Sequence, residues 1–310
     1  MGKIAFLMAG QGSQYPGMAR EFFENIKEVH DFFGVAEAIR PGTLAQIISG
    51  TEEELKQTEN TQPCVFLADM ASAMALKNEG INPDAAAGFS LGEVAGLAIT
   101  GAMSKEDAFK LVCTRGKAMN KAATEHEGVM IAVLRMDKEE LEKVCEETGV
   151  YPVNYNCPGQ IVVSGKKNEM KHLMEILSEK KVRYVELATS GPFHTPYMGG
   201  ASEEVRSVLK EKKLYNINST EIPLYSNMTG TPYPSEEEEI AETLALQASN
   251  SVRWEETIRN MVKDGIDTFI ECGPGKTLSG FVKRIAPEAK IYNVSDMESL
   301  MKVKEALAGA

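Results

Sequence analysis

A serine flanked by glycines is the first feature of this sequence that could carry out chemistry. Residues 88–92 are GFSLG, which matches the pattern G-x-S-x-G of a serine nucleophile on a tight turn between a strand and a helix. Residues 84–89 predict the short strand and residues 91–100 the helix, so Ser90 is expected at a helix N-terminus. The backbone N–H of Leu91 would then face an oxyanion formed on Ser90. A glycine-rich packing turn is the alternative interpretation.

A serine nucleophile needs a general base, and the chain has four histidines. Three of them lie in polar or charged stretches and are interpreted as surface residues: His30, His126 and His172. His194 differs because it lies in a glycine- and proline-containing loop, residues 190–196, directly after a predicted strand. Loops of this kind border clefts, so His194 is the candidate base, and a loop histidine bonded only to backbone is the alternative. No acidic residue between Ser90 and His194 stands out as a third triad member.

Arg115 is a third candidate because it lies between an apolar run, residues 109–113, and Gly116. From these residues alone a surface arginine is the favoured interpretation, and a guanidinium directed into a crevice is the alternative. A run of four glutamates at residues 236–239 is interpreted as the first turn of a helix, where the helix dipole favours negative charge.

The elements that must position these residues follow an α/β alternation. An apolar strand at residues 3–9 leads into GQGSQ at 10–14, and a strand at 268–272 leads into GPG at 273–275, as expected for buried parallel strands that end in loops. Long helices are predicted over residues 61–79 and 104–122, and another runs from Pro196 to Lys212. We therefore expect a mainly parallel sheet covered by helices.

The stretch from residue 128 to 187 has a different order. Its apolar patterns and turns predict strands at 129–134, 150–156, 160–164 and 182–187, with helices at 137–147 and 168–180. This order, β-α-β-β-α-β, is that of a ferredoxin-like unit. We place this small domain at residues 127–188, inserted into a discontinuous catalytic domain of residues 1–126 and 189–310.

The composition excludes several classes of protein. A chain of 310 residues with 43% apolar and 25% charged residues is typical of a globular protein. We find neither a signal peptide nor an apolar stretch near the ~20 residues of a membrane span. The net charge of -12 argues against nucleic-acid binding. Five cysteines without a CxxC pair are interpreted as reduced thiols of a cytoplasmic protein, and no metal site is expected.

Six motifs occur in a fixed order between residues 10 and 276. They are GQGSQ at 10–14, GxSLGE at 88–93, RGKxM at 115–119, PFH at 192–194, NxVxW at 250–254 and GPGK at 273–276. Together they resemble the motifs of malonyl-CoA:acyl carrier protein transacylases, members of the acyltransferase family of fatty-acid and polyketide synthesis. The resemblance implies an α/β, hydrolase-like domain interrupted by a ferredoxin-like α+β domain. It also implies that malonyl passes from malonyl-CoA to the phosphopantetheine thiol of acyl carrier protein through a malonyl-serine intermediate, which supplies the extender unit for fatty-acid synthesis.

The same resemblance implies a role for each site residue. Ser90 is the nucleophile, His194 the general base and then acid, and the backbone amides of Gln11 and Leu91 form the oxyanion hole. The main-chain carbonyl of Gln247 orients the histidine, in place of an acidic triad member.

The acyl pocket follows from the resemblance in the same way. Arg115 binds the malonyl carboxylate in a two-pronged salt bridge. Met119 and Phe193 line the pocket, and the Phe-His pair at 193–194 matches malonyl-selective members. One departure is Phe89, where the family commonly has histidine, so no role is carried over to that position.

Coenzyme A enters as a thioester substrate and phosphopantetheine is carried by the partner, so no resident cofactor is expected. An acidic carrier protein needs a basic docking face on a chain of charge -12. The candidates are Lys180, Lys181, Arg183, Lys276, Lys283 and Arg284.

Two other functions remain open at this stage. A serine hydrolase would use the same nucleophile, base and oxyanion amides, but it would have no use for the carboxylate-binding Arg115. A non-catalytic scaffold for carrier protein, with a decayed site, is the second, and labelling of Ser90 by an active-serine probe would exclude it.

Overall fold

The larger of two sheets is parallel throughout, as the α/β alternation predicts. The computed structural model describes residues 2–189 and 191–309; Ser190, at the start of the predicted histidine loop, lies outside them. The strand order is β7-β2-β1-β8-β9, and every pairing is parallel. The strands are β1 (Lys3–Met8), β2 (Ala85–Gly88), β7 (Leu224–Tyr225), β8 (Ile266–Cys272) and β9 (Lys290–Val294).

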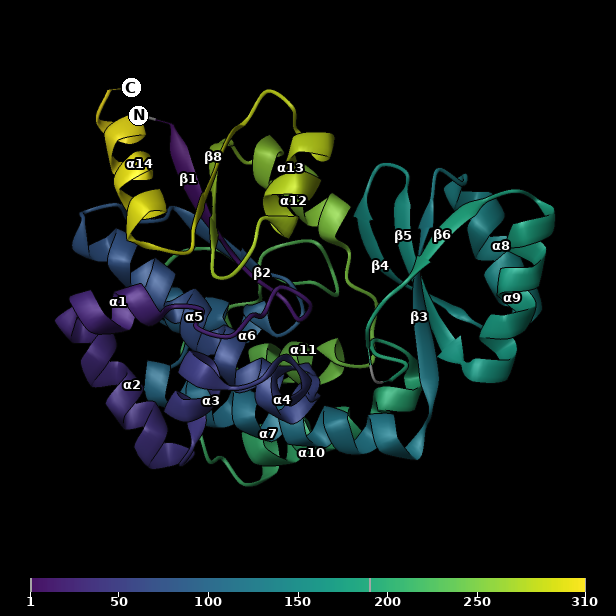
Figure 1. Ribbon diagram of the computed structural model, residues 1–310, viewed down its shortest axis with the longest axis horizontal. Helices are drawn as coiled ribbons and strands as arrows, with labels where there is room; N and C mark the ends of the chain where they lie inside the picture. Colours follow the sequence, from purple (N-terminus) through teal and green to yellow (C-terminus); the bar gives the residue numbers. More distant parts are fainter. Residues whose placement is uncertain (1, 190, 310) are drawn as a thin grey trace.

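Helices surround this sheet on both faces (Figure 1). They are α1 (Arg20–Asn25), α2 (Lys27–Ile39), α3 (Thr43–Ser49), α4 (Glu52–Lys56), α5 (Thr58–Asn78), α6 (Gly92–Ile99), α7 (Lys105–Glu125), α10 (Gly199–Arg206), α11 (Glu237–Gln247), α12 (Trp254–Lys263), α13 (Thr277–Ile285) and α14 (Met297–Ala308). The helix predicted from Pro196 to Lys212 is not uniform: a tight turn at Pro196–Met198 precedes α10, and a wider π-helical turn at Ser207–Glu211 follows it. The glutamate run at 236–239 does open α11.

Strand β1 shows why both faces of the sheet are covered. Its side chains alternate, so that Phe6 and Met8 lie in the core formed with α2, α5 and α14, whereas Ala5 and Leu7 lie in the core formed with α12 and α13. A strand buried on both faces has a continuous apolar sequence. The loops after β1, β2 and β8 leave the same edge of the sheet, because parallel strands end together.

The smaller sheet is antiparallel, with the strand order β4-β5-β3-β6. Its elements are β3 (Gly128–Leu134), α8 (Lys138–Thr148), β4 (Tyr151–Cys157), β5 (Gln160–Lys166), α9 (Lys167–Glu179) and β6 (Arg183–Glu186). The predicted β-α-β-β-α-β order is therefore confirmed, and so is the α/β class with a mainly parallel sheet interrupted by a smaller unit. The boundaries at residues 127 and 188 stay a prediction.

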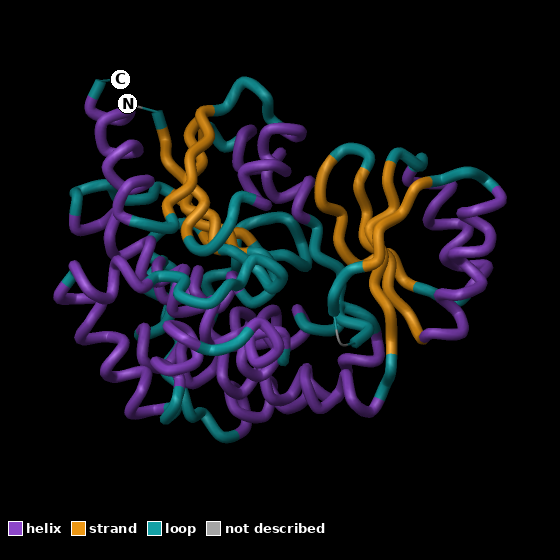
Figure 2. Tube along the Cα trace, in the orientation of Figure 1, coloured by secondary structure: helices purple, strands orange, loops and turns teal. Residues whose placement is uncertain are grey.

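The smaller sheet presents one face to its own helices and the other to the larger unit. Helices α8 and α9 lie on the outer side (Figures 1 and 2), where Ile131 and Val133 of β3 pack against them. Met130 and Ala132 alternate with these residues and pack with Met119 of α7. The sheet face that carries Met130 and Ala132 is therefore turned toward the larger unit. Among the described residues, no helix is both long enough and apolar enough to cross a membrane.

Candidate active site

Ser90 lies on the turn between β2 and α6, in a backbone conformation that non-glycine residues seldom adopt. Its φ is 54°, in the left-handed region, which typically stores strain at functional sites. The backbone N–H of Ser90 donates to Asn227 Oδ1 at 2.7 Å, which helps to hold the turn. Glycine is required at position 88 because a Cβ there would lie 1.9 Å from the carbonyl carbon of Gly92. The predicted strand–turn–helix around Ser90 is present, with Ser90 half-buried at the turn, and the packing-turn alternative does not account for the positive φ of a serine there.

His194 meets Ser90 across the space between the units. Its Nε2 lies 2.8 Å from Ser90 Oγ, and its Nδ1 lies 3.1 Å from the carbonyl oxygen of Gln247 and 3.0 Å from that of Asn250. Because carbonyls only accept hydrogen bonds, Nδ1 carries the proton in the neutral imidazole. Nε2 is then free to accept the serine proton. The carbonyl of Gln247 was predicted to orient the ring; that of Asn250 was not.

Burial keeps the imidazole neutral. It lowers the pKa of His194 to about 4, and the positive charge of Arg115 lowers it further, while the two carbonyls oppose the shift. An imidazole with this pKa is unprotonated at neutral pH, as a general base must be. His126, by contrast, caps the C-terminus of α7, and its ring lies 5.4 Å from that of Tyr197 in a tilted arrangement.

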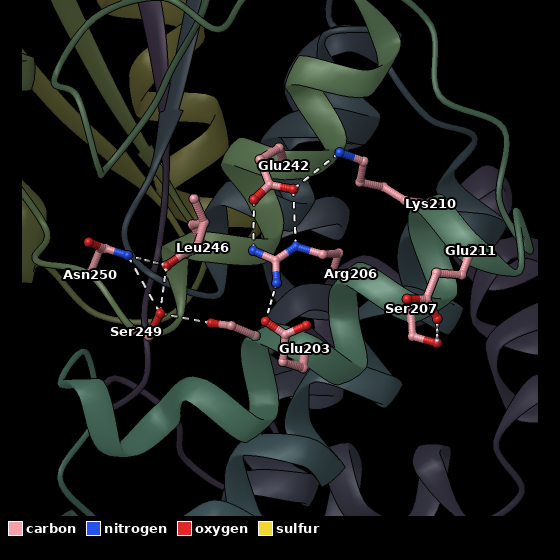
Figure 3. Close-up of polar contacts among 10 residues, drawn as sticks. Glu203, Arg206, Ser207, Lys210, Glu211, Glu242, Leu246, Ser249 and Asn250 are labelled. Atoms are coloured by element: carbon pink, nitrogen blue, oxygen red, sulfur yellow. Dashed lines mark hydrogen bonds and ion pairs between the residues drawn. The ribbon is translucent and has the colours of Figure 1, made fainter.

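Hydrogen bonds fix the turn that carries the two carbonyls (Figure 3). Asn250 Nδ2 donates to the carbonyl of Leu246 at 2.8 Å, and Ser249 Oγ donates to the same oxygen at 3.2 Å. Nearby, Arg206 of α10 binds both carboxylate oxygens of Glu242 on α11, with Nε–Oε2 and Nη2–Oε1 distances of 3.0 and 2.7 Å. These contacts tie the helix after the histidine loop to the helix that ends at Gln247.

Two backbone N–H groups near Ser90 have no acceptor among the described residues, those of Gln11 and Leu91. Gln11 lines the same cavity as Ser90 and His194, so both amides are suited to bind an oxyanion.

Phe89 packs beside these amides, with its ring centroid 5.4 Å from that of Trp254. A Cβ at Gly10 would come within 2.9 Å of the Phe89 ring, which explains the glycine there. The ring of Phe89 thus forms an apolar wall of the cavity.

Arg115 is buried, so the interpretation of a surface arginine is wrong. Its side chain is 1% exposed. Nη1 donates to Gln62 Oε1 at 2.8 Å, while Nη2 donates to Gln247 Oε1 at 2.7 Å and to Ser90 Oγ at 3.2 Å. Burial lowers its pKa to about 10, against the opposing charge of Glu93, so it is cationic at neutral pH. The adjacent Gly116 allows α7 to approach α5 closely, since a Cβ there would lie 3.3 Å from Gln62.

The cavity at Ser90 has a small inner part and a longer groove. The inner part has a volume of about 80 Å³ and is lined by Met119, Met130 and Phe193 beside Ser90 and His194. The groove has a volume of about 310 Å³ and runs between the smaller sheet and α13. Asn154 and Asn156 line it, and the Oδ1 atoms of both are buried without a partner among the described residues.

Sequence reasoning missed these two asparagines. The available signal was the pair of amides at alternate positions in an otherwise apolar strand, which places them on one face of β4.

The six basic residues predicted for docking belong to two groups: Lys180, Lys181 and Arg183 lie at and just before the start of β6, whereas Lys276, Lys283 and Arg284 belong to α13. Strand β4 packs on α12 and α13, and β6, which begins at Arg183, is the opposite edge of the smaller sheet. Lys180 is paired with Glu140 at 2.8 Å. Arg284 donates to Gln160 Oε1 at 3.0 Å. Lys276 is the N-cap residue of α13 and Lys283 lies in its last turn; residues of this helix line the groove.

All five cysteines are buried with free thiols. Within residues 2–189 and 191–309, no cluster of three or more His, Cys, Asp or Glu side chains could hold a metal ion.

Comparison with known proteins supplies the family. Residues 5–304 match the acyl transferase domain. The malonyl CoA-acyl carrier protein transacylase of Bacillus subtilis is 39% identical over 307 residues, covering 97% of this chain and 96% of that protein. The corresponding protein of Staphylococcus aureus is 33% identical over 309 residues, covering 97% and 98%.

Solved structures agree with this assignment. The crystal structure of malonyl CoA-acyl carrier protein transacylase from Clostridium perfringens has a TM-score of 0.93 at 38% identity, covering 99% of this chain and 98% of that one. A malonyl-transacylase in complex with a type II PKS acyl-carrier protein has a TM-score of 0.92 at 31% identity, covering 98% and 99%. The resemblance found in the motifs is confirmed, and the chain belongs to the acyl transferase family.

Proposed function

We propose that this chain transfers a malonyl group from malonyl-CoA to the phosphopantetheine thiol of an acyl carrier protein, through a malonyl ester on Ser90. The observation that carries the proposal is the buried cation beside an activated serine: Arg115 Nη2 lies 3.2 Å from Ser90 Oγ. A carboxylate on an acyl group attached to Ser90 would lie within reach of this guanidinium. The relatives whose names include malonyl CoA and acyl carrier protein support the same substrates.

The first half-reaction forms the ester. His194 Nε2 takes the proton of Ser90 Oγ, the oxygen attacks the thioester carbonyl carbon, and the resulting oxyanion accepts hydrogen bonds from the amides of Gln11 and Leu91. When the carbon–sulfur bond breaks, the coenzyme A thiolate takes the proton from His194. The enzyme then holds malonyl-Ser90 with a neutral imidazole, ready for the second substrate.

The second half-reaction reverses these roles. The phosphopantetheine thiol gives its proton to His194, its sulfur attacks the ester carbonyl, and Ser90 Oγ leaves and recovers the proton. Each step has a protein group assigned to it, which supports the proposal that no resident cofactor takes part. The groove lined by Asn154 and Asn156 offers amide partners to a pantetheine arm. The product is the extender unit for fatty-acid synthesis, and we propose that it is made in the cytoplasm.

For carrier-protein docking we propose Lys276 and Lys283, because α13 borders the groove. Met119 and Phe193 are proposed to line the acyl pocket, on the evidence of the inner cavity.

The alternative functions are less well supported. A serine hydrolase acting on neutral esters would offer Arg115 no carboxylate to bind, and burying a cation without a counter-charge costs free energy. A decayed scaffold would not need a serine held at a positive φ with a histidine 2.8 Å away.

The proposal is tested by mixing the protein with malonyl-CoA and measuring its intact mass. We expect one added malonyl group, absent in Ser90→Ala, and its loss when carrier protein bearing phosphopantetheine is added. Steady-state rates should follow ping-pong kinetics. An adduct that persists in Ser90→Ala would defeat the assignment of the nucleophile, and rapid release of free malonate with no transfer would favour the hydrolase.

A further inference from the structure

A buried carboxylate lies beneath the nucleophile turn and takes no part in the steps above. Glu93 is in the first turn of α6 and is fully buried. Its Oε2 accepts from the backbone N–H of Asn227 at 3.0 Å and from Gln247 Nε2 at 3.1 Å, and its Oε1 accepts from the hydroxyl of Tyr233. A carboxylate with this many donors is held firmly in one position.

The side-chain amide of Gln247 lies between this carboxylate and Arg115. Its Nε2 donates to Glu93 Oε2 and, at 2.8 Å, to the carbonyl of Ser90. Its Oε1 accepts from Arg115 Nη2 at 2.7 Å. A carboxylate and a carbonyl only accept, and a guanidinium only donates. One orientation of the amide therefore satisfies both ends, and Glu93 is one of the groups that select it.

This arrangement separates the Arg115 guanidinium by one amide group from the carboxyl group of Glu93, whose pKa is raised by burial to about 7. Among the described residues, Arg115 is bonded to the oxygens of Gln62, Gln247 and Ser90 and to no carboxylate. A glutamate in direct contact would compete with a substrate carboxylate for the guanidinium. With Gln247 between them, Glu93 still favours the cationic form of Arg115 electrostatically, but it leaves the guanidinium available to a ligand.

We propose that Glu93 is a positioning residue for acyl selection: acting through Gln247, it holds Arg115 directed toward Ser90 while leaving it free to bind a substrate carboxylate. This inference rests on the proposed function. It assigns Glu93 an effect on malonyl that acetyl, which lacks the carboxylate, does not experience.

The test compares kcat/KM for malonyl-CoA and for acetyl-CoA in two variants of similar size. Glu93→Met cannot accept a hydrogen bond from Gln247 through an oxygen, so the amide is released and the malonyl-to-acetyl ratio should fall about tenfold, mainly through a higher KM for malonyl-CoA. Glu93→Gln keeps an oxygen acceptor at the same distance, so its ratio should stay close to that of the unchanged protein. A ratio in Glu93→Met equal to that of the unchanged protein, or an equal fall for both substrates, would overturn the proposal.

Glu271→Met is the matched control. Glu271 is also a buried glutamate, and its oxygens accept from the backbone N–H groups of Leu278 and Ser279 at 3.0 and 2.7 Å. Its loss should lower the melting temperature without changing the malonyl-to-acetyl ratio. A ratio that falls as far in Glu271→Met as in Glu93→Met would show that any buried glutamate matters in this way, and would overturn the specific role.

Should Glu93→Met fail to fold, Glu93→Asp and Glu93→Gln decide the question. Aspartate keeps the charge but withdraws the carboxylate by one methylene group, so a positioning role predicts a lower ratio for Asp than for Gln. The opposite order would overturn it. The unchanged protein is measured alongside: if it shows no preference for malonyl, the proposed function itself fails, whereas a clear preference that no Glu93 variant alters refutes only the present inference.

Discussion

Replacing Arg115 with alanine should turn a malonyl-selective transferase into an unselective one. The side chain is 1% exposed, and its guanidinium lies beside Ser90 Oγ. Removing it leaves the malonyl carboxylate in an apolar pocket without a counter-charge. Acetyl has no carboxylate and loses nothing by this change, so acetyl transfer should be unchanged or faster.

The magnitude follows from the burial of the pair. Truncating one partner of a buried, hydrogen-bonded ion pair costs roughly 2 to 5 kcal/mol, and one decade in rate is about 1.4 kcal/mol, so kcat/KM for malonyl-CoA should fall by at least about 25-fold. Arg115→Lys should recover only part of the preference, because an ammonium cannot serve Gln62, Gln247 and a carboxylate together with the planar geometry of a guanidinium.

The assay is the ratio of kcat/KM for malonyl-CoA to that for acetyl-CoA, measured from the rate of acyl-enzyme formation. Arg259→Ala is the control, since that arginine is half exposed and pairs with Glu255 on the surface of α12. The melting temperature of each variant should also be measured, because Arg115→Ala removes the hydrogen-bond donor to Gln62 and Gln247 and can therefore lower stability. If both substrates lose the same factor in a folded Arg115→Ala protein, Arg115 is structural and the hydrolase alternative regains support.

Further predictions concern the base and the docking face. His194→Ala should slow both half-reactions by ~10²-fold or more, and a larger loss in His126→Ala would show that the wrong histidine was chosen. Because the pKa of His194 is lowered to about 4, acylation should be independent of pH near neutrality and decline as the pH falls toward 4, measured by quenched-flow acylation; a midpoint near the ordinary value of ~6.5 would contradict the burial argument. Protein stability should change in the same direction. Below the unfolded-state pKa of about 6.5 the imidazole is protonated in the unfolded chain but not in the folded one, so the melting temperature should fall as the pH drops from about 6.5 toward 4. Lys276→Glu with Lys283→Glu should weaken transfer to carrier protein but not acylation, and less so in high salt; equal loss in both half-reactions would place these lysines elsewhere in the mechanism.

The elements, and the positions of the proposed nucleophile and base, could be predicted from the sequence, because their signals are local. Glycines at 88 and 92 encode the tight turn at Ser90, and apolar runs encode strands such as β1 and β8. The β-α-β-β-α-β order of the predicted elements within residues 128–187 indicated the second unit. Each of these features depends on backbone conformation or on side-chain alternation within a few consecutive residues.

The surroundings of Ser90 and His194 were decided by the tertiary structure. Arg115 is buried because the face of α7 that carries it packs on α5 and on the end of α11, which the sequence of α7 alone does not show. Gln247 contacts Glu93 and Ser90 across more than 150 residues. Long-range contacts of this kind have no local pattern, since they depend on which helix faces meet. The sequence by itself therefore determined the order of elements and pointed to Ser90 and His194 as the proposed nucleophile and base, whereas the packing of α7, α11 and the smaller sheet decided which polar groups set the charge and orientation of the site.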